Sequence, residues 1–111
     1  MKHSKTTCGP EDDPMECNVA KTLQVIGSKW TMHILHVLFS GTQRFGQLQR
    51  ALPGISPKTL SERLTQLERR DLISKKVFAE VPLHVEYTLT PKGQSLNDIF
   101  DKMALWGEKA L

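Results

Sequence analysis

The 111-residue chain lacks the features by which most enzymes and membrane proteins are identified. It has no glycine-rich phosphate-binding loop, no nucleophile–base set and no metal-ligand spacing, so we expect no enzymatic activity, no cofactor and no bound metal. No apolar run approaches the roughly 18 residues of a membrane-spanning helix. The basic start, Met1 to Lys5, is not followed by an apolar segment, so we expect no secretory signal and a cytoplasmic location.

Cysteine is also scarce, since Cys8 and Cys17 are the only two. In a cytoplasmic protein we expect them to be free thiols rather than a structural disulfide. Cys17 is expected at or just before a helix N-terminus, where the positive end of the helix dipole favours the thiolate. One interpretation is redox sensing by Cys17, with Cys8 as a resolving thiol if the preceding segment folds back. The alternative is that Cys17 is a small, partly buried apolar residue without chemistry.

The net charge is only +3, but the charge is unevenly distributed along the chain. The segment 43–76 holds eight cationic and three acidic side chains. Acidic residues gather near the N-terminus instead, at Glu11, Asp12, Asp13 and Glu16. A local excess of positive charge within a small domain is typical of proteins that bind nucleic-acid phosphates.

Residues 56–70 lie in the middle of that basic segment and predict a well-formed helix. Ser56 can cap the helix through its hydroxyl, and Pro57 suits the first helical position. Leu60, Leu64 and Leu67 recur at helical spacing and form one narrow apolar stripe. The opposite face carries polar and charged groups and suits the major groove of DNA. An ordinary solvated surface helix would share this pattern, so the neighbouring segments must discriminate.

The preceding segments predict a helical domain that follows a tail. Residues 1–16 contain glycine, prolines and charges without apolar periodicity, and we interpret them as a flexible tail, with residues 17–111 as one domain. A first helix is expected from Asn18, which would be its cap. A second, strongly apolar helix is expected at 29–39. We assign its two histidines, three residues apart, to a polar face rather than to a metal site.

The remaining segments predict a helix-turn-helix followed by a wing. A short helix is expected at 45–52, and Pro53-Gly54 then breaks the chain before the helix that starts at Pro57. Helix, tight turn, helix is the arrangement of the helix-turn-helix motif. Residues 72–78 resemble a strand, and residues 84–89 alternate between apolar and polar side chains, so the two segments predict a β-hairpin.

A last helix is predicted from Thr90-Pro91, which repeats the cap-then-proline pattern of Ser56-Pro57. The expected fold class is therefore α+β, mainly α. It is a winged helix-turn-helix with a two-stranded wing and with dimerisation helices at the N- and C-terminal ends.

The order of these elements, with several short motifs, resembles the HxlR family of bacterial winged helix-turn-helix transcription regulators, which are MarR-like. The resemblance covers nearly the whole chain from Cys17 to Trp106. Each motif is weak alone, but all occur in order and at the family's spacing. The motifs are Cys17, Ile26-Gly27-Ser28-Lys29-Trp30, Arg44-Phe45 with Leu48, Leu52-Pro53-Gly54-Ile55-Ser56, Leu60 with Arg63, Leu64, Leu67 and Glu68, and Glu80-Val81-Pro82 with Val85-Glu86-Tyr87, Leu89 and Thr90.

The resemblance implies a homodimer that binds an inverted-repeat operator in double-stranded DNA and acts on transcription, in the simplest case as a repressor. Some family members sense oxidants or electrophiles through a cysteine near the position of Cys17, which implies an oxidant or small-molecule inducer. Family members commonly have Pro-Arg where this chain has Leu83-His84, so we expect a weaker, pH-sensitive wing contact. The candidate DNA-binding residues are Arg44, Ser56, Lys58, Thr59, Ser61, Glu62, Arg63, Gln66, Lys75, Lys76 and His84.

The predicted last helix carries more apolar side chains than the core of a small domain requires. We interpret the excess as a two-fold dimer interface, and the alternative is one wide stripe that faces the core. The candidate interface residues are Val19, Leu23, Ile26, Leu96, Ile99, Phe100, Met103 and Trp106.

A different class of function stays open at this stage. A winged-helix fold can serve as a protein-interaction module, with the outer helix face against a partner protein instead of DNA. Salt-dependent binding of DNA would discriminate between the two, because phosphate contacts weaken as the salt concentration rises.

Overall fold

A computed structural model describes residues 8–111, so the basic N-terminus and His3 lie outside the described residues. The structure has the predicted architecture, mainly helical with a small antiparallel sheet. Within residues 8–111 we find no helix with both the length and the apolar character needed to cross a membrane. The elements in chain order are α1 (Pro14–Ile26), α2 (Lys29–Phe39), β1 (Gln43–Arg44), α3 (Phe45–Ala51), α4 (Pro57–Arg69), β2 (Ile73–Phe78), β3 (His84–Leu89), α5 (Pro91–Gln94) and α6 (Leu96–Ala110).

The winged-helix body comprises α2, α3, α4 and the sheet, and it holds the hydrophobic core. Ile34, Leu48 and Leu60, from three different helices, are 0% exposed. These helices meet because each carries an apolar stripe at helical spacing, as in α4, where Leu64 and Leu67 continue the stripe of Leu60. The core therefore fixes the orientation of α4 within the body.

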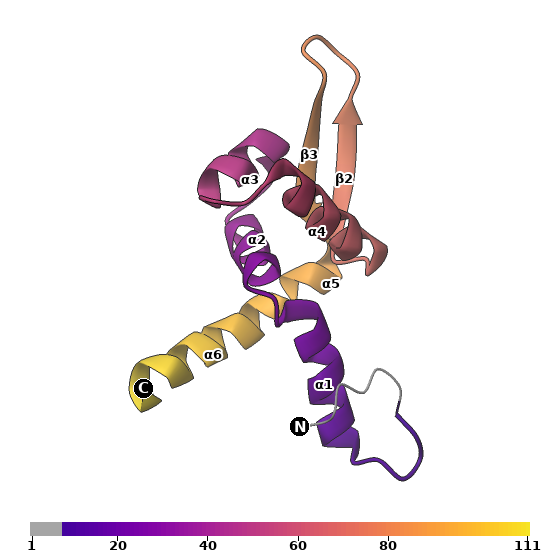
Figure 1. Ribbon diagram of the computed structural model, residues 1–111, viewed down its shortest axis with the longest axis vertical. Helices are drawn as coiled ribbons and strands as arrows, with labels where there is room; N and C mark the ends of the chain where they lie inside the picture. Colours follow the sequence, from indigo (N-terminus) through magenta and orange to yellow (C-terminus); the bar gives the residue numbers. More distant parts are fainter. Residues whose placement is uncertain (1–7) are drawn as a thin grey trace.

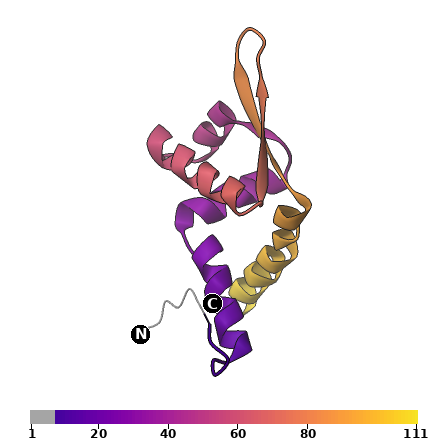
Figure 2. The ribbon, with the colours of Figure 1, turned by 90° about the vertical axis from the view of Figure 1, so that its right-hand side faces the viewer.

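The two arms, α1 and α6, extend from the body in different directions (Figure 1). The β2–β3 hairpin rises from the opposite end of the body (Figure 2). The Cα radius of gyration is 16.0 Å, compared with about 13 Å for a compact chain of this length. The arms and the hairpin thus leave much of their surface outside a single compact unit.

The sheet has the strand order β1-β3-β2, and both pairings are antiparallel. The hairpin register runs from Ile73 opposite Leu89 to Phe78 opposite His84. Because successive side chains of a strand alternate between faces, Ile73, Tyr87 and Leu89 share the face that packs on the core. The predicted wing strands are confirmed, whereas β1 was not predicted, because its two residues are strand only through their pairing with β3.

The helix predictions agree closely for α2, α3 and α4, but the predicted start of the first helix is wrong. Helix α1 begins at Pro14 rather than after Asn18. Its cap is Asp13, whose side chain accepts a hydrogen bond from the Met15 backbone N–H at 3.0 Å. The predicted last helix is two helices, α5 and α6, which meet at Ser95.

Candidate nucleic-acid interface

Helix α4 is the element on which the candidate DNA surface is built. Ser56 Oγ accepts a hydrogen bond from the Thr59 backbone N–H at 3.0 Å, and Pro57 occupies the first turn, as predicted. The three leucines on its inner face are at most 2% exposed. A capped helix that is held by buried leucines presents its outer face on a rigid support.

The turn that precedes α4 depends on Gly54. Its φ of +93° lies in the left-handed region, which favours glycine. A Cβ at this position would lie 3.9 Å from the Trp30 ring of α2. The Gly27-Ser28-Lys29-Trp30 motif and the Pro53-Gly54 turn, which lie apart in the sequence, therefore meet in the structure.

The predicted DNA-contacting residues of α4 differ in their accessibility. The exposed ones are Ser56, Lys58, Ser61, Glu62 and Gln66. Thr59 and Arg63 are half-buried on the flank of the helix. The Ser56 hydroxyl is engaged twice with Thr59, as acceptor from its N–H and as donor to its Oγ1 at 2.9 Å. Ser56 therefore has a capping role whether or not it also contacts DNA.

The cations of the hairpin fall on two different faces. Lys76 lies opposite Glu86, and Lys75, one position earlier in β2, points to the other face. Arg44 of β1 also lies beside Glu86 and shares the face of Lys76. The register thus groups Arg44, Lys76 and His84 and separates Lys75 from them.

His84 is held within the wing by two contacts. Its ring stacks on Phe78, with the centroids 4.5 Å apart and the planes at 11°. Its Nε2 lies 3.3 Å from Glu86 Oε2, and its side chain is only 15% exposed. Both contacts restrict the reach of the ring, which favours the prediction of a weak wing contact at Leu83-His84.

Tyr87 anchors the base of the wing to the body, since its side chain is 8% exposed. Burial raises the pKa of its phenol above the ordinary value of 10.0, and the negative charge of Glu68 raises it further. Tyr87 is therefore protonated and neutral at physiological pH. The Tyr87 side chain itself adds no charge to the surrounding surface.

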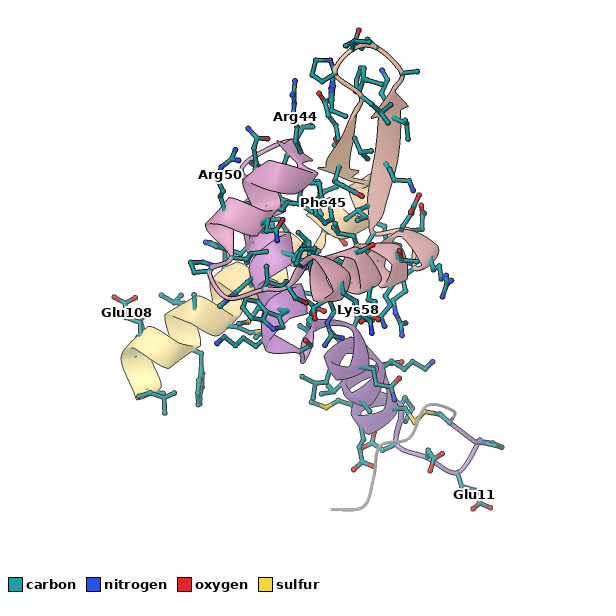
Figure 3. All side chains as sticks on the ribbon, turned by 45° about the horizontal axis from the view of Figure 1, so that its top comes forward. Glu11, Arg44, Phe45, Arg50, Lys58 and Glu108 are labelled. Atoms are coloured by element: carbon teal, nitrogen blue, oxygen red, sulfur yellow. A yellow bond between two sulfur atoms is a disulfide. The ribbon has the colours of Figure 1, made fainter. Side chains whose placement is uncertain are left out.

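The charge asymmetry of the sequence persists in the structure. Arg44, Arg50 and Lys58 lie on the winged-helix body, whereas Glu11 lies in the loop before α1 and Glu108 near the end of α6 (Figure 3). A pocket of about 440 Å³ separates α3 from the wing, and Arg44, Arg50 and His84 line it. The body is the part of the protomer that is suited to a polyanion.

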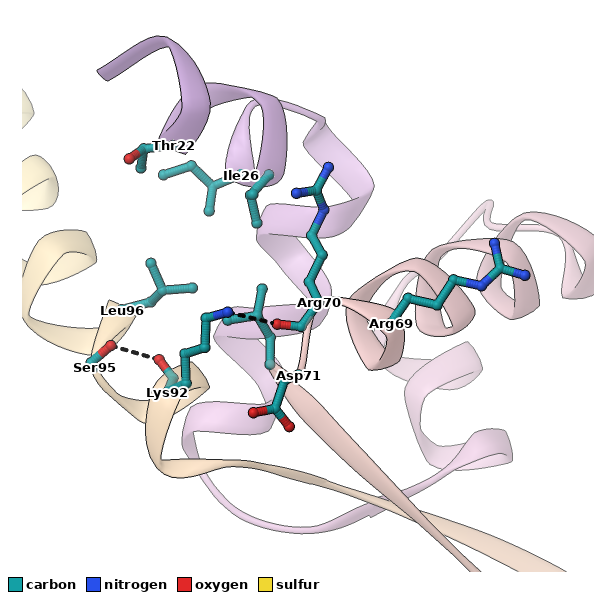
Figure 4. Close-up of a pocket in the computed structure, with 10 residues that line it drawn as sticks. Thr22, Ile26, Arg69, Arg70, Asp71, Lys92, Ser95 and Leu96 are labelled. Atoms are coloured by element: carbon teal, nitrogen blue, oxygen red, sulfur yellow. Dashed lines mark hydrogen bonds between the residues drawn. The ribbon is translucent and has the colours of Figure 1, made fainter. Parts of the chain in front are cut away.

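The C-terminal end of α4 is tied to the start of α5. Asp71 has a φ of +61°, the left-handed conformation that ends the helix. Thr90 Oγ1 donates to the Asp71 carbonyl oxygen at 2.6 Å. Lys92 Nζ donates to the Arg70 carbonyl oxygen at 2.9 Å (Figure 4). A groove of about 500 Å³ borders this junction. Because α5 leads into α6, the position of α4 is linked to that of the C-terminal arm.

Cys8 and Cys17 form a disulfide, so the prediction of two free thiols is wrong (Figure 3). Their Cα atoms are 6.1 Å apart. The loop between them turns back on itself through hydrogen bonds between Gly9 and Asp12, in both directions. The early start of α1 brings Cys17, which is 7% exposed, within reach of Cys8. The two predicted redox residues are therefore brought together.

One group of three possible metal ligands occurs within residues 8–111. It consists of Cys8, Asp12 and Cys17, whose ligand atoms lie within 4.8 Å of one another. Thiolates bind metals, and these two sulfurs are instead bonded to each other. His33 and His36 do not belong to this group.

The arms expose apolar side chains that the body leaves uncovered. Ile26 and Leu96, predicted at the dimer interface, are only 5% and 9% exposed and pack within the protomer. Phe100 contacts Phe39 edge to face, with the ring centroids 5.3 Å apart. These three residues have little surface left for a partner.

Met15, which sequence reasoning placed in the tail, continues the apolar stripe of α1. The exposed apolar residues of the arms are Met15, Val19, Leu23, Ile99, Met103, Leu105 and Trp106.

Comparisons with known proteins agree with this geometry. Residues 25–111 match the family model of the HxlR-like helix-turn-helix. The HTH-type transcriptional regulator YodB of Bacillus subtilis (strain 168) is 39% identical over 85 residues, which are 77% of this chain and 76% of YodB.

Solved structures show the same relationship. A transcriptional regulator of Porphyromonas gingivalis W83, described as a member of the MarR family, has a TM-score of 0.80 and 40% identity over 91% of this chain and 99% of its own. The reduced form of YodB has a TM-score of 0.77 and 34% identity over 89% of this chain and 94% of its own. YodB has also been solved after diamide treatment and with quinone bound.

The matched region takes in the end of α1 and every element from α2 to α6. It includes the helix-turn-helix, the wing and the C-terminal arm. The chain therefore belongs to the HxlR-like helix-turn-helix family of transcriptional regulators.

Proposed function

We propose that this regulator is a DNA-binding repressor that acts as a homodimer on an inverted-repeat operator. The observation that carries the proposal is the exposure of the outer face of α4. The buried leucines orient this face toward solvent, and the helix lies within the basic segment 43–76. In a helix-turn-helix the second helix enters the major groove. Lys58 and Gln66 would offer an ammonium and an amide to base edges, and Arg44 and Lys76 would contact phosphates.

The dimer in this proposal is formed by the arms. Val19 and Leu23 on α1, and Met103 and Trp106 on α6, are each about half exposed or more. Apolar surface on two projecting helices is unfavourable in water and can be covered by the same helices of a second copy. A two-fold axis between the arms would then place two copies of α4 on two half-sites. A cytoplasmic dimer bound across a promoter would block access of the transcription machinery.

A thiol response through Cys8 and Cys17 is the second part of the proposal. The diamide-treated form of the relative YodB supports the choice of oxidant. In the reduced chain, the two thiols would give up two protons and two electrons to diamide, whose N=N bond becomes a hydrazine as the Sγ–Sγ bond forms. The new bond would fix the loop before α1. Because α1 also carries Val19 and Leu23 of the proposed interface, formation of the disulfide would change the position of the second copy relative to the first.

Selection of bound sequences from random DNA tests the proposal, followed by titration of the selected duplex at increasing salt. We expect an inverted repeat, and an affinity that falls at least about tenfold between 50 and 200 mM salt, because several phosphate contacts displace counterions. Unselective DNA recovery, or affinity that is indifferent to salt, would favour the protein-interaction alternative.

The thiol response has a separate test. Diamide should change the operator affinity of the native chain but leave the Cys17→Ser variant unchanged. Cys8→Ser should give the same result, because the bond needs both sulfurs. An oxidant effect that persists in both variants would exclude this disulfide from the response.

A further inference from the structure

A small polar pocket lies on the flank of α4, where this helix meets the junction of α1 and α2. Its volume is about 370 Å³. Two guanidinium groups line it, and no carboxylate does. Neither arginine forms an ion pair with a carboxylate of residues 8–111. The polar residues of the lining are Gln24, Ser28, Thr31, Arg63, Gln66 and Arg70.

Two polar side chains of this lining make no hydrogen bond with the described residues. Arg63 Nε is inaccessible to solvent and makes no hydrogen bond with the described residues. Thr31 is only 5% exposed, and its hydroxyl has no hydrogen-bond partner in the same part of the chain. Buried polar groups in folded proteins are almost always paired, because an unpaired donor loses its hydration without compensation. These two unpaired donors therefore suit a ligand that accepts hydrogen bonds.

The N-terminus of α2 opens at the same pocket. Ser28 is the N-cap residue, yet its side chain makes no capping hydrogen bond, so its hydroxyl is free to donate. The backbone N–H groups of the first turn have no acceptor within an α-helix. The helix has 11 residues, and its dipole adds partial positive charge at this end. Backbone and side-chain donors thus gather on one side of the pocket.

We propose that this pocket binds a phosphate group. Its lining takes donors from both α2 and α4, which matches a tetrahedral oxyanion with oxygens on several sides better than a planar carboxylate with two. Helix N-termini and arginines are the usual partners of phosphate in proteins. The volume is sufficient for inorganic phosphate or for the phosphate end of a small metabolite. The proposal does not depend on DNA binding, because one protomer supplies the whole lining.

The phosphate group has two possible sources, a free ligand and the DNA backbone. Arg63 and Arg70 lie about a quarter to a third of a turn around α4 from the outer face that carries Lys58 and Glu62. This position borders the candidate DNA surface without being part of its centre. Figure 4 shows the Arg70 side chain pointing toward α1, whereas the Arg69 side chain diverges from it. Arg69 is therefore the matched control, since it is a neighbouring arginine of the same helix that does not line the pocket.

The first experiment follows the arginine Nε–H signals of the full chain by NMR while inorganic phosphate is added at constant ionic strength. We expect one signal, identified as Arg63 by its loss in Arg63→Gln, to shift and saturate. In the variants, binding is followed through the backbone amide signals of residues 28–31. Arg63→Gln and Thr31→Val should each weaken the affinity for phosphate, and Arg63→Gln should do so about tenfold. Arg69→Gln should bind like the native chain. Thermal unfolding verifies each fold, and Ser28→Ala is the replacement if Arg63→Gln does not fold.

Saturable binding that needs Arg63 and Thr31 supports the pocket. A shift that grows linearly, that chloride reproduces, or that is unchanged in Arg63→Gln and Thr31→Val would show only general screening and would overturn the proposal.

The second experiment adds duplex DNA to distinguish the sources. If phosphate weakens DNA binding in the native chain but not in Arg63→Gln, the pocket takes a backbone phosphate. If the Arg63 signal still responds to phosphate when DNA is saturating, the pocket takes a free ligand. If neither phosphate nor DNA moves the Arg63 signal, the proposal fails. Failure of the chain to bind DNA would leave the first experiment unaffected, so the two proposals fail separately.

Discussion

The winged-helix body buries its apolar side chains, whereas the arms leave many of theirs exposed to solvent. In the body, Ile34, Leu48 and Leu60 are 0% exposed, so the body is complete within one protomer. In the arms, Leu23 is 54% and Trp106 is 64% exposed, although both lie on regular helices. The comparison separates residues that fold the chain from residues that a second chain would cover in the proposed dimer. Substitutions in the two regions should therefore have different kinds of effect.

The largest effect is expected from a core substitution in the body. Leu64→Ala removes a side chain that is 2% exposed, which should lower the free energy of unfolding by about 2–5 kcal/mol because a cavity remains. Urea unfolding followed by circular dichroism measures this change. Leu105→Ala, at a position that is 50% exposed on α6, should cost under about 1 kcal/mol at the same protein concentration. Equal losses at both positions would remove the distinction between body and arms.

A charge in the arms should disrupt assembly rather than folding. Trp106→Glu places a carboxylate in the proposed interface, and we expect sedimentation to show a monomer with a native circular dichroism spectrum. Operator affinity should fall about a hundredfold, because two linked half-site contacts become independent. Lys109→Glu, an exposed position near the end of the same helix, is the control for the added charge. A Trp106→Glu dimer of native affinity would place the interface elsewhere.

Loss of a single DNA contact in the body should be smaller. Lys58→Ala removes an exposed ammonium from the outer face of α4 and should weaken operator binding about tenfold. The sedimentation coefficient should remain that of the dimer. Lys109→Ala on the arm should leave the affinity unchanged, as measured by gel shift at one fixed salt concentration. Native affinity in Lys58→Ala would reject this face of α4.

The two faces of the wing can be separated in the same assay. Lys76→Ala should weaken binding about threefold, because Lys76 shares its face with Arg44. Lys75→Ala should have a smaller effect, because its side chain points to the other face. A larger loss in Lys75→Ala would mean that the opposite face of the hairpin meets the DNA.

The smallest effect is expected from the Tyr87 phenol. Its pKa in the folded chain is raised above 10.0 by burial and by Glu68, so the phenol of the unfolded chain ionises first as the pH rises. The stability from the neutral phenol is therefore complete below pH 10 and decreases above it. Tyr87→Phe should unfold with a weaker dependence on alkaline pH, measured by chemical unfolding in a pH series. An identical slope in both proteins would contradict this linkage.

The elements that sequence predicted well are those with local signals at both ends. Helix α4 starts with Ser56-Pro57 and has a leucine stripe, and the structure confirms its start at Pro57. Helix α1 has the same kind of start, Asp13-Pro14, but the charges around it masked the signal. As a result, Met15 was assigned to the tail, although it extends the exposed stripe of the arm.

The features that sequence missed depend either on contacts between residues distant along the chain or on the exact conformation of a short loop. Strand β1 exists only through its pairing with β3. The Cys8–Cys17 bond follows from the turn at Gly9 and Asp12, which an argument from cellular compartment does not consider. The pocket beside Arg63, at which we propose phosphate binding, draws on three helices and has no linear motif. The opposite faces of Lys75 and Lys76 follow from the period of a strand, so this distinction was available in the sequence.

The tie between α4 and α5 has a consequence for the choice of operator. The carbonyl oxygens of Arg70 and Asp71 are held by Lys92 and Thr90, and Gly93 packs closely on the Leu72 backbone. In the proposed dimer, the angle at which the two α6 helices cross would therefore set the distance between the two copies of α4. Substitutions in α6 that change this angle would therefore change the preferred spacing of the two half-sites. No residue that contacts a base would need to change.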